Sequence, residues 1–307
     1  METQASIKFD KHPINPIPSL ATQEGTWKED ASMTVDLIQV GNDYLIYYVG
    51  KSEGKDCIGV ARCSVSEFDG VAWKDEPDNP ILAPGEVGSF DDRHLVDPAS
   101  VRWQGSVYLY YSALGAGPDS IGLAISDDGI SFDKHPEPVI VGRAPEVVVH
   151  DGLIHMLYSM ENPQGGYEFH LATSEDGFNF KKQGPVFKPS ESGWDSLSVV
   201  TPRILSEEGI YILTYAGDRD EKDYPTGFGL AFSQDLRNWI KYPRNPVMSV
   251  GGPGEWDSRA VWFPEMFHAH EKYYMWYEGY DGDTSRVGLA ISQEAIAEIG
   301  HNTLGLV

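Results

Sequence analysis

The sequence has few cysteines, few basic residues and no long apolar run. Its 307 residues include 2 cysteines, Cys57 and Cys63, which make no disulfide framework, so we expect free thiols. Lys and Arg number 23 against 47 Asp and Glu, a formal net charge of −24. This balance argues against binding to nucleic acid or to an anionic membrane, because both need a basic surface. No apolar stretch reaches the length that crosses a bilayer.

Targeting signals and cofactor motifs are also missing. The amino terminus, "METQASIKFDK", lacks the apolar core of a secretory signal, which predicts a cytoplasmic protein unless a signal has been removed. We find no zinc-ligand spacing, no phosphate-binding glycine loop after a strand and no nucleophilic Ser or Cys elbow. We therefore expect no cofactor and no metal.

A short aromatic strand containing a tyrosine near its end recurs five times. The copies are "YLIYYVG" (44–50), "VYLYYSA" (107–113), "IHMLYSM" (154–160), "IYILTYAG" (210–217) and "YYMWYEG" (273–279). Their alternation of aromatic and aliphatic residues predicts β-strands. The 32 glycines and 20 prolines spread along the chain fit a protein of strands and turns.

A second segment precedes each of these strands. The copies are "TVDLI" (34–38), "DPASV" (97–101), "APEVV" (144–148), "TPRIL" (201–205) and "FPEMF" (263–267). The middle residue of each copy lies twelve positions before the recurrent tyrosine, as in 36 to 48 and 99 to 111. A constant spacing in five copies indicates five equivalent units.

Two further strands complete each unit, and one of them is displaced. The third strand is represented by "IGLAIS" (121–126) and "VGLAIS" (287–292), and a fourth follows in four units, for example "ISFDKHPEPVI" (130–140). The fifth copy of the fourth strand is "IKFDKHPINPI" (7–17), at the opposite end of the chain. We therefore predict an all-β fold: a five-bladed β-propeller of four antiparallel strands per blade. It would be one domain over 1–307, with its last blade closed by residues 7–17.

In a propeller the first strand of each blade lines the central channel, so the second repeated segment should wall it. The middle residues form a column: Asp36, Ala99, Glu146, Arg203 and Glu265. Because side chains two residues apart on a strand point the same way, Asp97 should share the face of Ala99. We therefore predict that one end of the channel is ringed by Asp36, Asp97, Glu146, Arg203 and Glu265.

An aromatic residue stands nine positions before the column in four units: Trp27, Phe90, Trp194 and Trp256. The polar residues that follow should bring Asp30, Arg93, His94 and Arg259 to the same mouth. Trp27, Trp256 and Trp262 could stack on a sugar ring or pack in the core, and both interpretations stay open. The expected substrate-binding residues are Arg203, Glu265, Arg259, His94, Asp30, Trp27 and Trp256.

Acidic groups brought together from separate blades suggest chemistry on a sugar. Like charges raise the pKa of at least one carboxyl group, and an arginine lowers another. Ion pairs with Arg203 or Arg259 are the structural alternative. Cleavage of a glycosidic bond needs one protonated and one ionised carboxyl group, which is what such a ring can supply.

The blade pattern resembles the five-bladed propeller glycosidases, which include glycoside hydrolase families 32, 43, 62, 68, 117 and 130. "HLVDPASV" is similar to the Asp-Pro segment of family 32. The resemblance implies that Asp36 is the base or nucleophile, that Asp97 supports it and that Glu146, in "GRAPEVV", is the general acid. Asp30, in "WKEDASMTVD", is a rival for the first role.

The chain also departs from those families. Glu146 follows a proline instead of preceding one, and "MTVDLI" stands where family 32 has Asn-Asp-Pro. Family 43 members often place a histidine near a channel-bound calcium, which leaves a calcium beside His268 or His270 as an alternative to our expectation of no metal. A histidine hydrogen-bonded within its strand is the simpler interpretation of both.

Three functions remain open at this point. The first is a hydrolase that cleaves a terminal glycosidic bond in an arabinofuranoside, xyloside, fructofuranoside or related oligosaccharide. The second is a phosphorylase or transglycosidase on the same fold, in which Arg203 and Arg259 would serve phosphate. The third is a carbohydrate-binding propeller without activity.

Overall fold

A computed structural model of the protein describes residues 6–306. Three consecutive long antiparallel strands recur along the chain. They are β2 (Ala31–Val40), β3 (Asp43–Ser52) and β4 (Lys55–Ser64); β6 (His94–Trp103), β7 (Ser106–Leu114) and β8 (Ser120–Ser126); β11 (Arg143–His150), β12 (Leu153–Glu161) and β13 (Tyr167–Ser174); β15 (Ser198–Glu207), β16 (Ile210–Asp218) and β17 (Gly227–Ser233); and β20 (Ala260–Ala269), β21 (Lys272–Tyr280) and β22 (Ser285–Ser292). The all-β prediction is confirmed.

Further elements flank these triplets. The remaining strands are β14 (Lys181–Phe187) and the two-residue strands β1 (Asp10–Lys11), β5 (Lys74–Asp75), β9 (Asp133–Lys134), β10 (Ile140–Val141), β18 (Ile240–Lys241) and β19 (Met248–Ser249). The helices are η1 (Pro18–Leu20), η2 (Val65–Glu67) and α1 (Ile296–Leu304), and α1 packs on β16 and β17. Within residues 6–306 no helix is long and apolar enough to cross a membrane.

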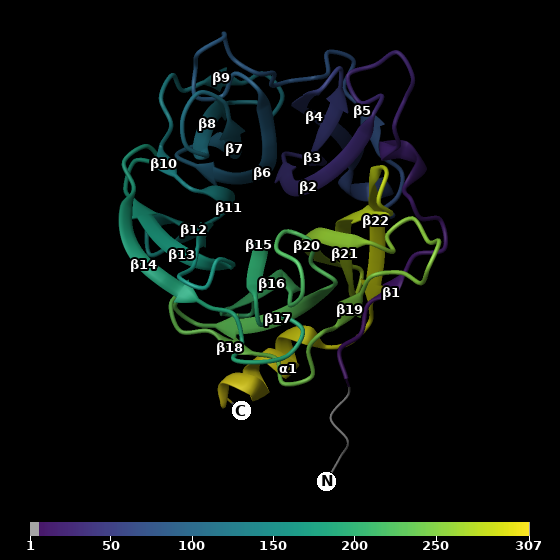
Figure 1. Ribbon diagram of the computed structural model, residues 1–307, viewed down its shortest axis with the longest axis vertical. Coiled ribbons are helices and arrows are strands. Elements are labelled where there is room, and N and C mark those ends of the chain that lie inside the picture. The colour runs from purple at the N-terminus through teal and green to yellow at the C-terminus, as the bar shows by residue number, and fades with distance from the viewer. Residues whose placement is uncertain (1–5, 307) are drawn as a thin grey trace.

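The triplets form sheets that surround a common axis (Figure 1). β11–β12–β13–β14 and β20–β21–β22–β1 are four-stranded, and β15–β16–β17–β18 carries β19 as a fifth strand. The first two triplets share one sheet, joined only through a parallel pairing of Asp56 with His94. The first strands of the triplets contact one another in a closed ring, in the order β2, β6, β11, β15, β20 and back to β2. These inner strands are therefore the ones that meet at the axis.

The displaced amino-terminal segment occupies the fourth-strand place beside β22. Lys11 pairs with Ala290, and its ammonium lies 2.6 Å from Asp257 Oδ2. The side chain of Asn15 donates to Leu289 O and accepts from Leu289 N, at 2.8 Å each. The fourth-strand lysines of two other sheets make the same ion pair: Lys134 with Asp91 and Lys241 with Asp195. The sequence similarity of residues 7–17 to those strands therefore reflects the same set of contacts.

Candidate active site

Each inner strand has a β-bulge at the same place. The register with the second strand shifts there in all five triplets, between Met33 and Val35 in the first and between Val96 and Ala99 in the second. One residue in each bulge has a positive φ: Thr34 (38°), Asp97 (56°), Ala144 (49°), Thr201 (55°) and Phe263 (51°). Non-glycine residues rarely adopt this conformation, and a bulge re-aims the side chains on either side of it.

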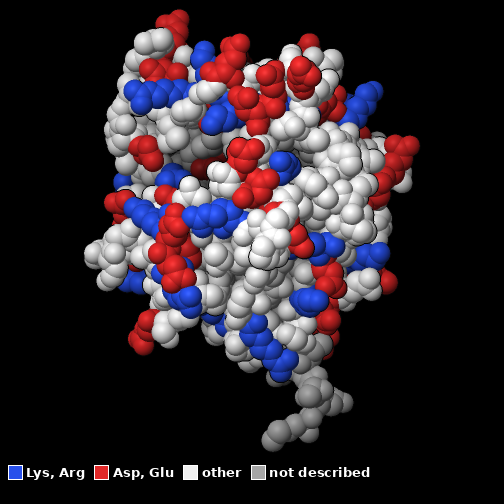
Figure 2. All heavy atoms as spheres, turned by 45° about the vertical axis from the view of Figure 1, so that its right-hand side comes forward, with Lys and Arg blue, Asp and Glu red and all other residues white. Residues whose placement is uncertain are grey.

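A pocket of about 370 Å³ lies over these bulges. All five positive-φ residues line it, together with residues from the second and third strands of several triplets. Four of its lining residues are acidic and two are basic: Asp56, Asp97, Asp223, Glu278, Lys51 and Arg143. The space-filling view shows a hollow bordered by acidic and basic side chains on one face (Figure 2). The volume lies in the range of small-molecule sites.

Three nearly buried carboxyl groups line this pocket and have a pKa that burial raises: Asp56, Asp97 and Glu278. Asp56 is paired with His94. Asp97 is 5% exposed, and its Oδ2 accepts a hydrogen bond from Ser112 Oγ at 2.6 Å. Burial raises the pKa of Asp97, while the charge of Arg143 and the bond from Ser112 oppose that rise. Ser112 Oγ also accepts from Ala144 N at 2.7 Å, so the hydroxyl joins two neighbouring bulges.

Glu278, on β21, is the buried carboxyl group of the pocket that pairs with no histidine or arginine in the described structure. Its Oε2 accepts from Thr34 Oγ1 at 2.8 Å and its Oε1 accepts from Ser285 Oγ at 2.7 Å. Burial raises the pKa of Glu278 to about 7, although both hydrogen bonds lower it. A carboxyl group whose pKa is raised to near neutrality suits a proton donor.

Sequence reasoning missed Glu278, although a signal for it was present. The residue directly follows the recurrent tyrosine of the second strand, where the other units have Val49, Ser112, Ser159 and Ala216. Glu278 is the one charged residue of that column, and two other members of the column, Ser112 and Ser159, also touch the site. Aligning the residues that follow the recurrent tyrosine in the five units would have revealed Glu278.

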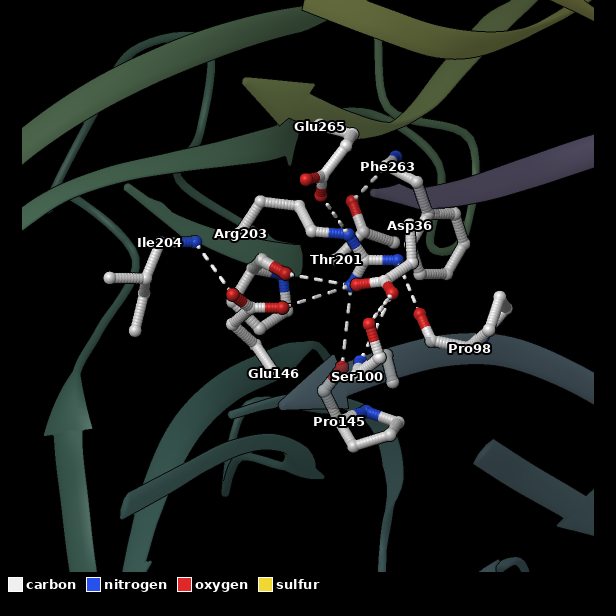
Figure 3. Close-up of polar contacts among 12 residues, drawn as sticks. Asp36, Pro98, Ser100, Pro145, Glu146, Thr201, Arg203, Ile204, Phe263 and Glu265 are labelled. Carbon is white, nitrogen blue, oxygen red and sulfur yellow. Dashed lines mark hydrogen bonds and ion pairs between the residues drawn. The ribbon is translucent and has the colours of Figure 1, made fainter. Parts of the chain in front are cut away.

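The column residues of the inner strands form a separate, buried group behind the bulges, here called the axial cluster (Asp36, Glu146, Arg203 and Glu265). Arg203 is 1% exposed, and its Nε lies 3.0 Å from Glu265 Oε2. Its Nη1 lies 3.5 Å from Glu146 Oε2 (Figure 3). Asp36 Oδ2 accepts hydrogen bonds from the backbone N–H and the hydroxyl of Ser100. None of the four residues lines the pocket.

The carboxyl groups of the axial cluster hold their protons unusually strongly. Burial raises the pKa of Asp36 to about 6 and that of Glu146 to about 8, against the opposing charge of Arg203. Burial and the neighbouring carboxylates raise the pKa of Glu265 well above its usual range. Three acids share one guanidinium, so protonation relieves the excess negative charge.

The structure does not place Asp36, Asp97 and Glu146 together in the pocket lining, as the predicted ring required: Asp97 lines it, and Asp36 and Glu146 do not. The prediction assumed an uninterrupted strand, in which residues two apart face the same way. The bulge breaks that rule and turns Asp97 toward the pocket, while Asp36 and Glu146 face inward. Arg203 and Glu265, expected to bind substrate, bind each other instead.

The residues expected at the mouth have different positions. His94 Nδ1 lies 2.8 Å from Asp56 Oδ2, so His94 adjoins the pocket through Asp56. Arg259 pairs with Glu221 at 2.6 Å and does not line the pocket. Asp30 is exposed and does not line it either.

The two tryptophans expected to bind sugar pack against their own sheets. A Cβ added to Gly50 or Gly59 would lie 2.3 or 2.4 Å from ring atoms of Trp27, and Trp256 covers Gly279 in the same way. Neither ring lines the pocket, which favours the core interpretation. Trp262 does line it.

The histidines considered for calcium lie away from this pocket. His268 contacts Glu207 and stacks on Tyr273 with ring centroids 4.3 Å apart. Neither His268 nor His270 lines the pocket. Among residues 6–306, no group of three or more His, Cys, Asp or Glu side chains is placed to hold a metal ion.

Known proteins with similar sequences act on glycosides where their function is named. A family model described as the glycosyl hydrolases family 32 N-terminal domain matches residues 145–294. An uncharacterised protein of Mycobacterium tuberculosis is 25% identical over 271 residues, covering 82% of this chain and 88% of that one. A 1,2-beta-oligomannan phosphorylase of a Thermoanaerobacter species is 27% identical over 203 residues, covering 60% of this chain and 63% of that one.

Solved structures share the fold at low identity. A glycosyl hydrolase from Bacteroides ovatus has a TM-score of 0.74 at 16% identity and covers 94% of both chains. A second structure has a TM-score of 0.74 at 17% identity, and the match covers 95% of both chains. Its description concerns the GH130 family of mannoside phosphorylases, which contains glycoside hydrolases that target beta-1,2 mannosidic linkages in Candida mannan. The chain thus has a propeller-like glycosidase fold, and its predicted resemblance to the propeller glycosidase superfamily is confirmed.

Proposed function

We propose that this chain is a five-bladed propeller enzyme that hydrolyses a terminal glycosidic bond in the pocket over the bulges. Glu278 acts as general acid, and Asp97 acts as base or nucleophile. The observation that carries the proposal is that these two buried carboxyl groups line one pocket of ligand size. The blade count follows from treating the nine-stranded sheet as two blades, since each half has its own triplet and its own bulge.

The environments of the two groups support their roles. No basic side chain contributes to the pKa of about 7 at Glu278, so no nearby positive charge favours its ionised form. Burial raises the pKa of Asp97 as well, but the positive charge of Arg143 opposes that rise and favours the ionised form of Asp97. A pair of carboxyl groups in such unlike surroundings is the arrangement that separates an acid from a base.

The first substrate to test is a β-mannoside. The named relative is an oligomannan phosphorylase, and the structural neighbour of family 130 is described by its mannosidic linkages. Trp262 on the pocket wall offers an aromatic face for a sugar ring. Pentofuranosides, xylosides and fructofuranosides form the second panel.

Phosphorolysis is the second candidate. Lys51 and Arg143 line the pocket, and cationic donors of this kind are what a phosphate nucleophile needs. The named relative at 27% identity is a phosphorylase. Acidic residues outnumber the two basic ones in the lining, which would repel phosphate, so hydrolysis is placed first.

Glu278→Gln tests the proposal, with Glu146→Gln as a matched control from the axial cluster. Both replace a buried glutamate by its isosteric amide. On β-mannobiose, whose leaving group needs protonation, we expect Glu278→Gln to lose about 100-fold or more in kcat, and less than about 10-fold on 4-nitrophenyl β-mannoside. Glu146→Gln should change both rates equally and by only a few-fold. Adding inorganic phosphate and assaying for mannose 1-phosphate separates phosphorolysis from hydrolysis.

Three outcomes would contradict the proposal. If the wild-type protein cleaves no glycoside of either panel but binds sugar, a binding propeller is the better explanation. If Glu146→Gln shows the leaving-group dependence and Glu278→Gln does not, the acid belongs to the axial cluster. Equal loss on both substrates in Glu278→Gln would mean that this residue donates no proton.

A further inference from the structure

Arg203 holds the backbone of four bulges at once. Its two terminal nitrogens donate hydrogen bonds to the carbonyl oxygens of Val35 (3.1 Å), Pro98 (3.0 Å), Pro145 (3.3 Å) and Pro202 (3.1 Å). Each of these residues directly follows a bulge residue with positive φ. The four carbonyls come from β2, β6, β11 and β15, and they converge on one guanidinium (Figure 3).

The fifth bulge is tied to the same group indirectly. The carbonyl that follows Phe263 belongs to Pro264, and it accepts from Thr214 Oγ1 at 2.6 Å. Thr214 Oγ1 also lies 3.3 Å from Arg203 O. The guanidinium itself reaches the fifth strand through Glu265, and Phe263 N donates to Thr201 Oγ1 at 3.1 Å. All five bulges are therefore connected through Arg203 and its immediate neighbours.

We propose that Arg203 is a positioning residue that fixes the pocket floor and, above all, the direction of Asp97. A non-glycine residue with positive φ is strained, and it persists only where its surroundings hold it. The bond from Arg203 to Pro98 O is part of what holds Asp97. The catalytic consequence rests on the function proposed above.

The chemistry of the side chain suits this role. A guanidinium is planar and carries five N–H donors, so it can reach carbonyls that approach from several directions. Lysine has a single ammonium group and cannot donate to carbonyls in all of these directions. The charge of Arg203 is compensated by the carboxyl groups of the axial cluster, so it can remain buried. Because Arg203 is 1% exposed and lies outside the pocket lining, it acts on substrate only through the residues it holds.

The test compares Arg203→Ala, Arg203→Lys and the surface control Arg62→Ala, whose arginine pairs with Glu76. Misplacing a catalytic group by about 1 Å costs on the order of 100-fold in rate, so kcat of Arg203→Ala should fall by about that factor while KM changes little. Millimolar guanidinium chloride should restore at least about 10-fold of that loss by filling the vacated site. Arg203→Lys should remain slow with or without guanidinium, and Arg62→Ala should be unaffected throughout.

A second variant and a structural measurement keep the proposal testable if Arg203→Ala does not fold or if the protein cleaves no glycoside. Thr214→Val removes the hydroxyl that donates to Pro264 O and Arg203 O, leaves the guanidinium in place and should lower kcat by about 10-fold. A crystal structure of Arg203→Lys needs no activity, and it should show the positive φ lost at Asp97 or at another bulge. The proposal is overturned if all five bulges are unchanged in that crystal, or if kcat of an active enzyme is unaffected by replacing Arg203.

Discussion

The residues that line the pocket (the pocket layer) and the axial cluster lie on either side of the bulges, and their acidic groups have different surroundings. In the pocket layer, Asp97 and Glu278 accept hydrogen bonds from Ser and Thr hydroxyl groups and border an open volume. In the axial cluster, Glu146 and Glu265 contact Arg203, and Asp36 is bonded to Ser100. One bulge separates the two environments. On the inner strands, the position of a carboxyl group relative to the bulge decides whether it lines the pocket.

A raised pKa does not distinguish the two layers. Burial raises the pKa of Glu278 to about 7 and that of Glu146 to about 8, and the larger rise belongs to the group that lines no pocket. Buried structural clusters perturb pKa values as strongly as active sites do. Access to the pocket is therefore the better criterion here.

The largest expected difference between the layers is in activity. Asp97→Asn should lower kcat by about 10² to 10⁴-fold, the range for loss of a catalytic carboxyl group, while Asp36→Asn should lower it by less than about 10-fold. Steady-state rates on the best glycoside, with thermal unfolding as a check on folding, compare the two. A loss in Asp36→Asn as large as in Asp97→Asn would break the distinction between the layers.

The tryptophans offer a second contrast, in stability and binding. Trp256→Ala should lower the free energy of unfolding by about 3 kcal/mol, because the ring packs on Gly279 and Gly288, and leave KM nearly unchanged. Trp262→Ala should raise KM by roughly 10-fold through loss of an aromatic face of the pocket, with a smaller effect on stability. Urea unfolding and initial rates measure both. A larger increase in KM for Trp256→Ala than for Trp262→Ala would contradict this contrast and indicate that Trp256 binds the substrate.

The third and smallest contrast concerns pH. The folded-state pKa of Glu146 is raised from 4.5 to about 8, so the native state binds the proton more tightly than the unfolded chain does. Its contribution to stability is complete below about pH 4.5 and is lost as pH rises toward 8. The free energy of unfolding should therefore fall between pH 5 and pH 8, and Glu146→Gln should reduce that fall by about 1 kcal/mol or more. Urea titrations at both values test this, and an identical decline in the variant would contradict it.

Much of the fold could be predicted from repetition. The constant spacing of twelve residues identified the inner strands, and the displaced copy at residues 7–17 identified the pairing of β1 with β22. These inferences succeeded because each unit must bury equivalent faces against its neighbours, so the pattern recurs in the sequence.

The site was less predictable because a bulge has no simple period. The positive-φ residues of the five bulges include Thr34, Asp97 and Phe263 and no glycine, so the usual marker of that conformation is missing there. The prolines that follow four of the bulges carried the information: Pro98, Pro145, Pro202 and Pro264. Proline in an inner strand cannot join the hydrogen-bond ladder and is tolerated at bulges. Interpreting those prolines as markers of bulges would have predicted that Asp97 points in a different direction from the column residues.

The most direct test of the two-layer account is a crystal structure with a monosaccharide soaked into the protein, mannose first. We expect the sugar in the pocket over the bulges, with its anomeric oxygen within hydrogen-bond distance of Glu278 or Asp97 and no contact with the axial cluster. A sugar bound elsewhere, or one that reaches Asp36 or Glu146, would contradict the account.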